Sequence, residues 1–244
     1  MFARFSAALM GVSVVFHGGQ VLAHPCERGA EQIPQNALVE SRAGFQVRGE
    51  KGIFRLADVH VPDPAPLPQK ARLAGRASTD RYGRRAAHVF DKSGWFQGRL
   101  LQQGRALLVV GEADGDCLTA LREAEAQART AGRGVWRQPQ HRLRADETEA
   151  MANFAGRFVV VTGPVASVGD RKKRLYLNFG QNWSQDFTVS VVKSGRGAFK
   201  ERQAGALARF QALTGKTVRV RGVLEQRQGP LIRLADEAQI EILD

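Results

Sequence analysis

The chain has 244 residues, of which 43% are hydrophobic, and a formal net charge of +12. The hydrophobic share supports a packed core in one large or two small domains, and it argues against a chain without a core. The positive charge favours a polyanionic partner such as nucleic acid, because each arginine or lysine placed on a phosphate releases counterions. A solvated basic surface, or a genome-wide preference for arginine, would give the same charge.

The first residues have the pattern of an export signal, which we expect over residues 1–23. Arg4 supplies the positive charge, the run from Ser6 to Phe16 is apolar, and Val21 and Ala23 place small residues before a cut after Ala23. The apolar run is too short to span a membrane. We therefore expect a protein without a membrane span, in the periplasm or secreted.

Cys26 and Cys117 are the two cysteines of the chain. In an oxidising compartment an even pair predicts one disulfide, which would tie the N-terminus to the start of a helix. The alternative is two unpaired thiols.

The first half of the chain has the pattern of short strands followed by helices. A polar leader is expected over residues 24–36, and four prolines within residues 61–71 argue against a regular element throughout that stretch. The clearest helix is 116–131, with apolar residues at helical spacing and Gly132 at its end. The other elements expected are strands at 37–41, 45–48, 53–61, 85–90 and 105–110 and a helix at 96–103.

A charged connector at 138–153 separates this half from a second block at 154–244. There the pattern predicts three strands, a helix at 198–213 and two further strands. That order is typical of an OB-fold barrel. The strands are expected at 158–168, 174–180, 186–194, 217–225 and 231–235.

Three sequence blocks in the first half, DRYGRRAAHVF (80–90), GRLLQQGRALLV (98–109) and CLTALREAEAQARTAGRGVW (117–136), resemble the thermonuclease-like, or staphylococcal-nuclease-like, domain. YLNFGQNWSQDFT (176–188) resembles the OB-like domain that follows it in some exported bacterial proteins. The resemblance implies a nuclease-like domain at 37–137, itself built on a small barrel. We therefore predict a mainly β protein with helices (α+β), made of two tandem OB-like five-stranded barrels, each with packed helices.

The thermonuclease family cleaves phosphodiester bonds in nucleic acids with calcium, using two arginines and a carboxylate. Its motif R-L-x-x-[VI]-D-x-P-E stands here as RLADVHVPD, residues 55–63. By this resemblance Arg55 and Arg84 are the phosphate arginines, and Asp63 replaces the glutamate that positions water. Such roles fit the residue types, because guanidinium groups neutralise phosphoryl oxygens and a carboxylate orients water.

The metal ligands of the family are less well matched. In the family, two aspartates bind calcium. His60 stands where one of them would be, and Gly44 aligns with the other. Calcium prefers oxygen ligands, whereas imidazole suits zinc and similar ions. A site at His60 and Asp63 would therefore favour a different divalent metal. Residues 64–79 are also too few for the helix and strand that the family carries between these motifs.

Further residues are candidates for contact with single-stranded DNA or RNA. Basic groups and aromatic rings together suit this, because bases stack on rings while arginines hold phosphates. Trp183 could instead anchor its loop. The candidates are Arg81, Tyr82 and Arg85 in the first domain and Tyr176, Trp183, Arg219 and Arg221 in the second.

The leading hypothesis is an exported nuclease that hydrolyses DNA or RNA phosphodiesters. The main alternative is a degenerate module of the same fold that binds nucleic acid without turnover, which the loss of metal ligands favours. An envelope protein that binds another protein through its barrels is a third possibility.

Overall fold

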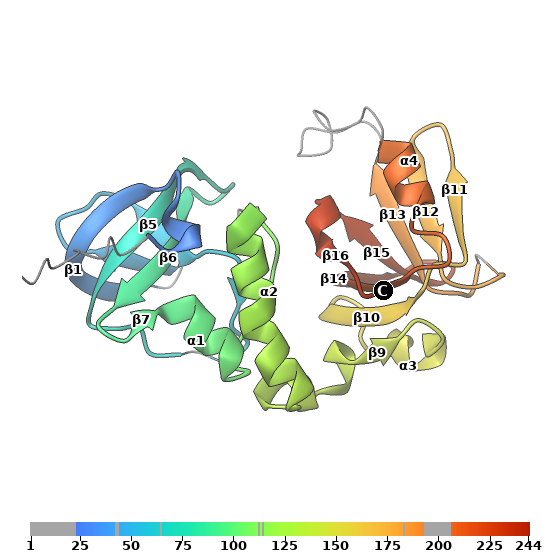
Figure 1. The fold of residues 1–244 in the computed structure, drawn as a ribbon, viewed down its shortest axis with the longest axis horizontal. Coiled ribbons are helices and arrows are strands. Elements are labelled where there is room, and N and C mark those ends of the chain that lie inside the picture. Colours follow the sequence, from blue (N-terminus) through green and yellow to red (C-terminus); the bar gives the residue numbers. More distant parts are fainter. Residues whose placement is uncertain are drawn as a thin grey trace, which may run out of the picture.

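The fold of the chain was obtained as a computed structural model (Figure 1). It describes residues 23–41, 44–63, 65–111, 113, 115–182, 184–192 and 206–244. The expected export signal lies outside these residues apart from Ala23, and so does the first half of the helix expected at 198–213. None of the described helices is long and apolar enough to cross a membrane.

The first half of the chain forms a closed barrel of five strands. The strands pair in the order β3-β2-β1-β5-β6, and a parallel pairing of β3 with β6 closes the ring. Phe54, Leu73 and Val89 are fully buried inside it. The strands are β1 (Glu31–Ser41), β2 (Gly44–Val47), β3 (Ile53–Leu56), β5 (Lys70–Thr79) and β6 (Arg84–Asp91), with a short β7 (Gly94–Trp95) beside β6.

The expected polar leader at 24–36 is not a leader throughout. A 3-10 turn, η1 (Pro25–Glu27), comes first, and β1 then begins at Glu31, which lies opposite Gly75 of β5. The strand was missed because it is polar on its outer face and contains Pro34. That proline falls at a register shift between Ile33 and Asn36, where a missing N–H costs no ladder bond.

The strand expected at 53–61 is broken by a turn at residues 57–58. Asp58 has φ of 57°, the left-handed region, and its carboxylate accepts hydrogen bonds from the backbone N–H groups of Gly111 and Ala113, both at 3.1 Å. These bonds hold the turn. After it, β4 (Val59–His60) pairs with β8 (Leu107–Leu108) instead of continuing the barrel.

Two helices cover this barrel, α1 (Phe96–Gln102) and α2 (Gly115–Thr130). Leu121 and Ala128 of α2 are fully buried, which confirms the face read from the sequence. The structure contains the disulfide Cys26–Cys117, which joins η1 to the start of α2 across 91 positions of sequence. Within residues 65–79 the structure describes the strand β5 but no helix, in keeping with the short segment.

The second half forms a curled half-barrel with the strand order β11-β12-β13-β15-β14-β10-β9, and β16 also pairs with β14. Val189, Val220 and Ile232 lie in its core. The strands are β9 (Leu143–Arg144), β10 (Phe158–Pro164), β11 (Ser167–Asp170), β12 (Arg174–Asn178), β13 (Thr188–Val192), β14 (Thr217–Gln226), β15 (Pro230–Leu234) and β16 (Ile240–Ile242). The helices are α3 (Thr148–Ala152) and α4 (Ala206–Gln211), with 3-10 turns at Gly134–Arg137, Pro139–His141 and Glu237–Gln239.

The connector expected at 138–153 is packed into the second barrel. Leu143 of β9 pairs with Val161 of β10, and Met151 of α3 is fully buried in the same core. The segment shows no hydrophobic face in sequence because its few apolar residues sit in separate short elements. A third cluster bridges the halves, where Leu107, Ala128 and Trp136 contact Val160.

The predicted fold class is thus confirmed: the protein is mainly β with helices and has two OB-like domains. Figure 1 shows α2 standing between the two domains, with one face toward each.

Candidate functional site

Arg55 and Arg84 lie on neighbouring strands of the first barrel. The parallel register of β3 and β6 sets Ile53 opposite Arg84 and Arg55 opposite Ala86. Side chains two residues apart share one face of a sheet, so both arginines project from the same face. The Nε of Arg84 lies 2.8 Å from Oδ2 of Asp80, and the Nε of Arg55 lies 3.7 Å from the same oxygen. The structure therefore brings the two expected phosphate arginines together at one carboxylate oxygen.

Asp80 organises the turn that leads into β6. Its Oδ1 accepts hydrogen bonds from the backbone N–H groups of Tyr82 and Arg84, at 2.9 and 3.0 Å. Desolvation works against ionisation, but these bonds and the Arg84 guanidinium hold the pKa of Asp80 below its usual value. Asp80 is therefore ionised at neutral pH and orients both arginines. The sequence indicates a polar turn at Asp80, but it does not show that Asp80 contacts both arginines.

The tip of that turn presents an aromatic ring to solvent. Tyr82 is 64% exposed, and the guanidinium carbons of Arg81 and Arg84 lie 4.7 and 5.2 Å from its ring centroid. Gly83 has φ of 74°, which lets the chain reverse there. An exposed ring between two arginines is a stacking surface beside cations.

Arg85 points to the opposite face of β6. Its guanidinium carbon lies 5.2 Å from the ring centroid of Phe54, its Nε donates to the backbone oxygen of Arg76, and it forms an ion pair with Glu31. These contacts lie across the sheet from Arg84, so we do not carry Arg85 into the candidate site.

The residues aligned with the calcium ligands do not fit calcium. A Cβ at Gly44 would lie 2.0 Å from the backbone oxygen of Phe54, so the close approach of β2 and β3 leaves no room for a carboxylate. His60 is exposed, and its ring centroid is 6.1 Å from that of Phe158 in the second domain. Asp63 lies exposed in a bend. Among the described residues, neither His60 nor Asp63 belongs to a group of three or more side chains that could hold a metal ion.

The group that does gather metal-binding atoms is the disulfide with His88. Nε2 of His88 lies 3.7 Å from Sγ of Cys117 and 3.4 Å from Oδ2 of Asp58, and all of these side chains are buried. Because the sulfurs of Cys26 and Cys117 are joined, they offer no thiolate to a metal. Trp95 donates its indole N–H to Nδ1 of His88, 3.2 Å away, which leaves the His88 proton on Nε2 facing Asp58. The cluster is a packed polar core.

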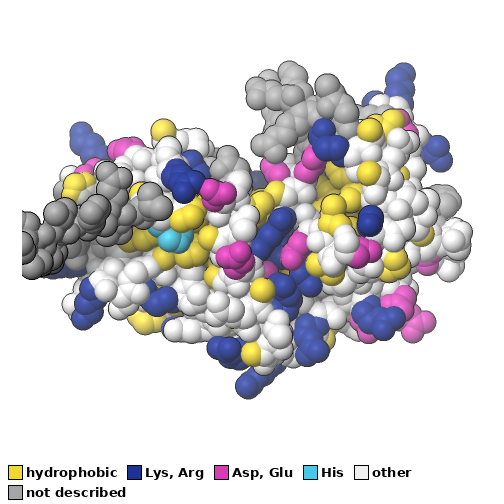
Figure 2. Space-filling model, viewed as in Figure 1, with side chains coloured by type: hydrophobic (Ala, Val, Ile, Leu, Met, Phe, Trp, Pro, Cys, Tyr) yellow, Lys and Arg dark blue, Asp and Glu magenta, His cyan; other side chains and the backbone are white. Residues whose placement is uncertain are grey.

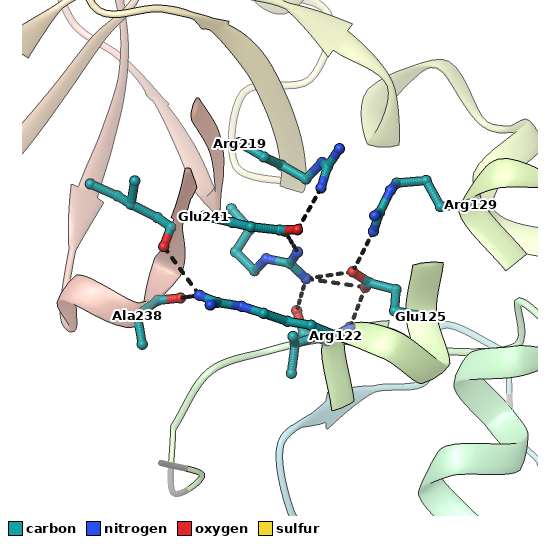
Figure 3. Close-up of polar contacts among 9 residues, drawn as sticks. Arg122, Glu125, Arg129, Arg219, Ala238 and Glu241 are labelled. Carbon is teal, nitrogen blue, oxygen red and sulfur yellow. Dashed lines mark hydrogen bonds and ion pairs between the residues drawn. The ribbon is translucent and has the colours of Figure 1, made fainter. Parts of the chain in front are cut away.

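Arg219 and Arg221 form ion pairs at the junction of the two domains, where Figure 3 shows Arg219 beside Glu241. Arg221 is 1% exposed, and its NH1 lies 2.9 Å from Oε2 of Glu125 on α2. Arg219 pairs with Glu241 at 2.9 Å. The expectation that both line a nucleic-acid face assumed that the outer surface of β14 is open, whereas α2 covers it. We therefore leave both out of the candidate nucleic-acid surface.

A groove of about 500 Å³ lies on the second barrel, between the hairpin after β11 and the turn after β14. Tyr176 lines it, whereas Trp183 lies outside the described residues. Ser190 is 1% exposed, and its Oγ has no hydrogen-bond partner in the described structure. The hairpin arginines were visible in the sequence, but Arg227 and Arg233 were missed because only the fold brings them to the same groove. Its cationic residues are Arg171, Arg174, Arg227 and Arg233.

Comparison with known proteins gives a family and a structural likeness. A solved structure titled "OBody AM1L10 bound to hen egg-white lysozyme" is similar over 43% of this chain and 96% of its own, with 22% identity and a TM-score of 0.31. The curated proteins give no match. The family model "Staphylococcal nuclease homologue" matches residues 66–138, which include Arg84 and the whole of α2. Residues 66–138 are therefore similar to the staphylococcal nuclease homologue family.

Proposed function

We propose that the first barrel binds the phosphodiester backbone of nucleic acid at Arg55 and Arg84. The observation that carries this proposal is the convergence of both guanidinium groups on one oxygen of Asp80, at 2.8 and 3.7 Å. Planar guanidinium groups held in this way can donate parallel hydrogen bonds to a phosphate. Tyr82 and Arg81 extend the surface with an exposed ring and a further cation.

The groove of the second barrel supports a single-stranded ligand. Four arginines line this groove together with Tyr176, and a ring in a cationic groove accepts a base without regard to sequence. A duplex keeps its bases stacked inside, so it would gain only the phosphate contacts. We therefore expect single-stranded DNA or RNA to bind more tightly than the matching duplex.

Binding is tested by fluorescence anisotropy of labelled oligonucleotides across a salt series. The Arg84→Ala variant is expected to weaken single-stranded binding and to lower the slope of log K against log salt by about 0.7 per lost phosphate contact. Arg84→Lys is the matched control, since it keeps the charge but loses the planar fork. Binding that Arg84→Ala and Arg55→Ala both leave unchanged would remove this site from the proposal.

Hydrolysis of the bound phosphodiester is the second candidate function. The observation that favours it is Asp63, a solvent-exposed carboxylate that follows β4 in the position where the family carries its water-positioning glutamate. In this role Asp63 would accept a hydrogen bond from the attacking water, while Arg55 and Arg84 stabilise charge on the phosphoryl oxygens. The donor set does not fit calcium, so no step is assigned to that ion. The alternative is a module that binds nucleic acid without turnover. In that module Arg55 and Arg84 bind phosphate, and Asp63 has no catalytic role.

Turnover is tested by incubating the protein with single-stranded DNA and RNA in calcium, zinc or a chelator. Cleavage that both Asp63→Asn and Arg84→Ala abolish supports the nuclease. Tight, salt-sensitive binding with no product supports the binding module. Absence of binding at low salt would reject both and favour an envelope protein that binds a protein partner.

We also propose that the protein is exported, with the first 23 residues as its signal. The disulfide Cys26–Cys117 supports this, because buried disulfides persist in oxidising compartments. Sequencing the N-terminus of the protein purified from the periplasm tests the proposal, with His24 expected as the first residue.

A further inference from the structure

The junction of the two domains gathers charged side chains from three elements (Figure 3). On α2, Arg122, Glu125 and Arg129 stand three and seven positions apart, so they share one face of the helix. On the second barrel, β14 supplies Arg219 and Arg221, and Glu241 of β16 lies opposite Arg219 in the strand register. Figure 2 shows basic side chains in the hollow between the domains.

The two carboxylates of this cluster are already shared. Glu125 accepts from Arg221 at 2.9 Å and from the backbone N–H of Leu108 at 2.8 Å, and it lies 3.5 Å from Arg129. Glu241 contacts Arg219 at 2.9 Å and Arg221 at 3.4 Å. Four guanidinium groups thus face two carboxylates, which leaves an excess of two positive charges among the described residues of the junction.

Arg122 shows where the excess lies. Its NH2 donates to the backbone oxygens of Ala238 and Ile240, at 2.9 and 3.1 Å, which carry no full charge. Its Nε is buried and has no hydrogen-bond partner in the described structure. Burial lowers the pKa of Arg122; the charge of Glu241 opposes this effect, and the positive charge of Arg221 adds to it. Its positive charge is only partly compensated.

The positive charge of Arg129, two turns further along α2, is also only partly compensated. Burial lowers the pKa of Arg129, and the charge of Arg219 adds to that effect. Burial lowers the pKa of His141 despite the opposing charge of Glu125, so His141 is neutral at pH 7 and leaves the charge balance unchanged. The cluster is still reachable, since the side chains of Arg129 and Arg219 are 22% and 13% exposed.

We propose that the domain junction is a binding site for a phosphate dianion, held by Arg122 and Arg129 of α2 with Arg219 of β14. A phosphate monoester carries about −1.5 to −2 charge at pH 7 and offers three acceptor oxygens, which matches the excess charge and the free donors. A phosphodiester carries a single negative charge and matches less well. The site is separate from Arg55 and Arg84 and does not depend on the function proposed for them.

Calorimetric titration of the full protein with three probes at constant ionic strength tests this site. Inorganic phosphate and a nucleoside monophosphate supply the dianion, and a dinucleotide with one internal diester is the control ligand. Saturable dianion binding at the junction is expected, with the diester about tenfold weaker or worse. Equal binding of the two dianions indicates free phosphate, and tighter binding of the nucleotide indicates a terminal phosphate group.

Variants separate this site from other basic surfaces. Arg122→Gln is expected to weaken dianion binding about tenfold or more. Arg133→Gln, which changes an exposed arginine just beyond α2, should leave it unchanged. If Arg122→Gln does not fold, as judged by circular dichroism, Arg129→Gln takes its place. No saturable dianion binding, equal binding by the junction variant, or a diester that binds as tightly as the monoester would each overturn the proposal.

Discussion

Arg221 of the second barrel and Glu125 of the first domain form an ion pair at 2.9 Å with side chains 1% and 0% exposed. NH1 of Arg221 also donates to the backbone oxygen of Leu108, and Glu125 accepts from the N–H of the same residue. A buried pair with these additional bonds fixes one arrangement of the two domains, because any shift would leave a charge without a partner.

Breaking this pair is expected to destabilise the whole protein. Glu125→Ala should cost about 3–5 kcal/mol, because it leaves the buried Arg221 charge with only its 3.4 Å contact to Glu241, which Arg219 shares. Denaturant unfolding followed by circular dichroism gives the value. Arg227→Ala breaks an exposed pair with Glu225 and should cost about 0–1 kcal/mol. A loss for Glu125→Ala as small as that of the control would contradict the structural role.

Removing the disulfide should lower stability without changing the fold. The double variant Cys26→Ala, Cys117→Ala is expected to lose about 2–5 kcal/mol, since the bond joins positions 91 residues apart and constrains the unfolded chain. Thermal unfolding of oxidised, reduced and variant protein measures the loss. The reduced wild type and the variant should agree, and a variant as stable as the oxidised protein would be inconsistent with this bond.

Restoring the family's carboxylates should succeed at one position and fail at the other. His60→Asp changes an exposed residue and should leave the protein folded. Gly44→Asp should destabilise it strongly, because the new Cβ would meet the Phe54 carbonyl at 2.0 Å. Thermal unfolding of both variants checks this expectation, which a stable Gly44→Asp protein would refute.

The acid dependence of stability should reflect Asp80. Its pKa is lowered in the folded state, so its contribution is present above the ordinary value of 3.8 and is lost as the pH falls below that value. Asp80→Asn should therefore remove part of the loss of stability on acidification below that pH. Denaturant midpoints measured over an acidic pH series compare the two proteins, and parallel curves would exclude this role.

The packing of the connector can be tested at α3. Met151→Ala should cost about 2–5 kcal/mol, because this side chain is fully buried in the core of the second barrel. Glu149→Ala on the exposed face of the same helix should stay within about 0.5 kcal/mol of the wild type. Unfolding curves of the two variants provide the comparison, and similar values would show that the connector is not part of the core.

The sequence by itself determined the fold class, the main helix and the turn that leads to Arg84. Strong alternation and helical spacing survive in single elements, and the turn before Arg84 is a local pattern that needs no distant partner. The start of β1 and the packing of residues 138–153 could not be predicted in this way. Their stability comes from pairing and burial against segments far away in sequence, such as β5 and β10.

Tertiary structure alone decided what the charged residues contact. Asp80 binds both Arg55 and Arg84 because β3 and β6 lie side by side, and Arg221 is buried because α2 covers β14. The sequence gives the charge of each residue. The ion-pair partner of that residue depends on which distant elements the fold brings close to it. That is why the sequence did not show that Arg55 and Arg84 share Asp80, or that Arg219 and Arg221 of β14 lie at the domain junction.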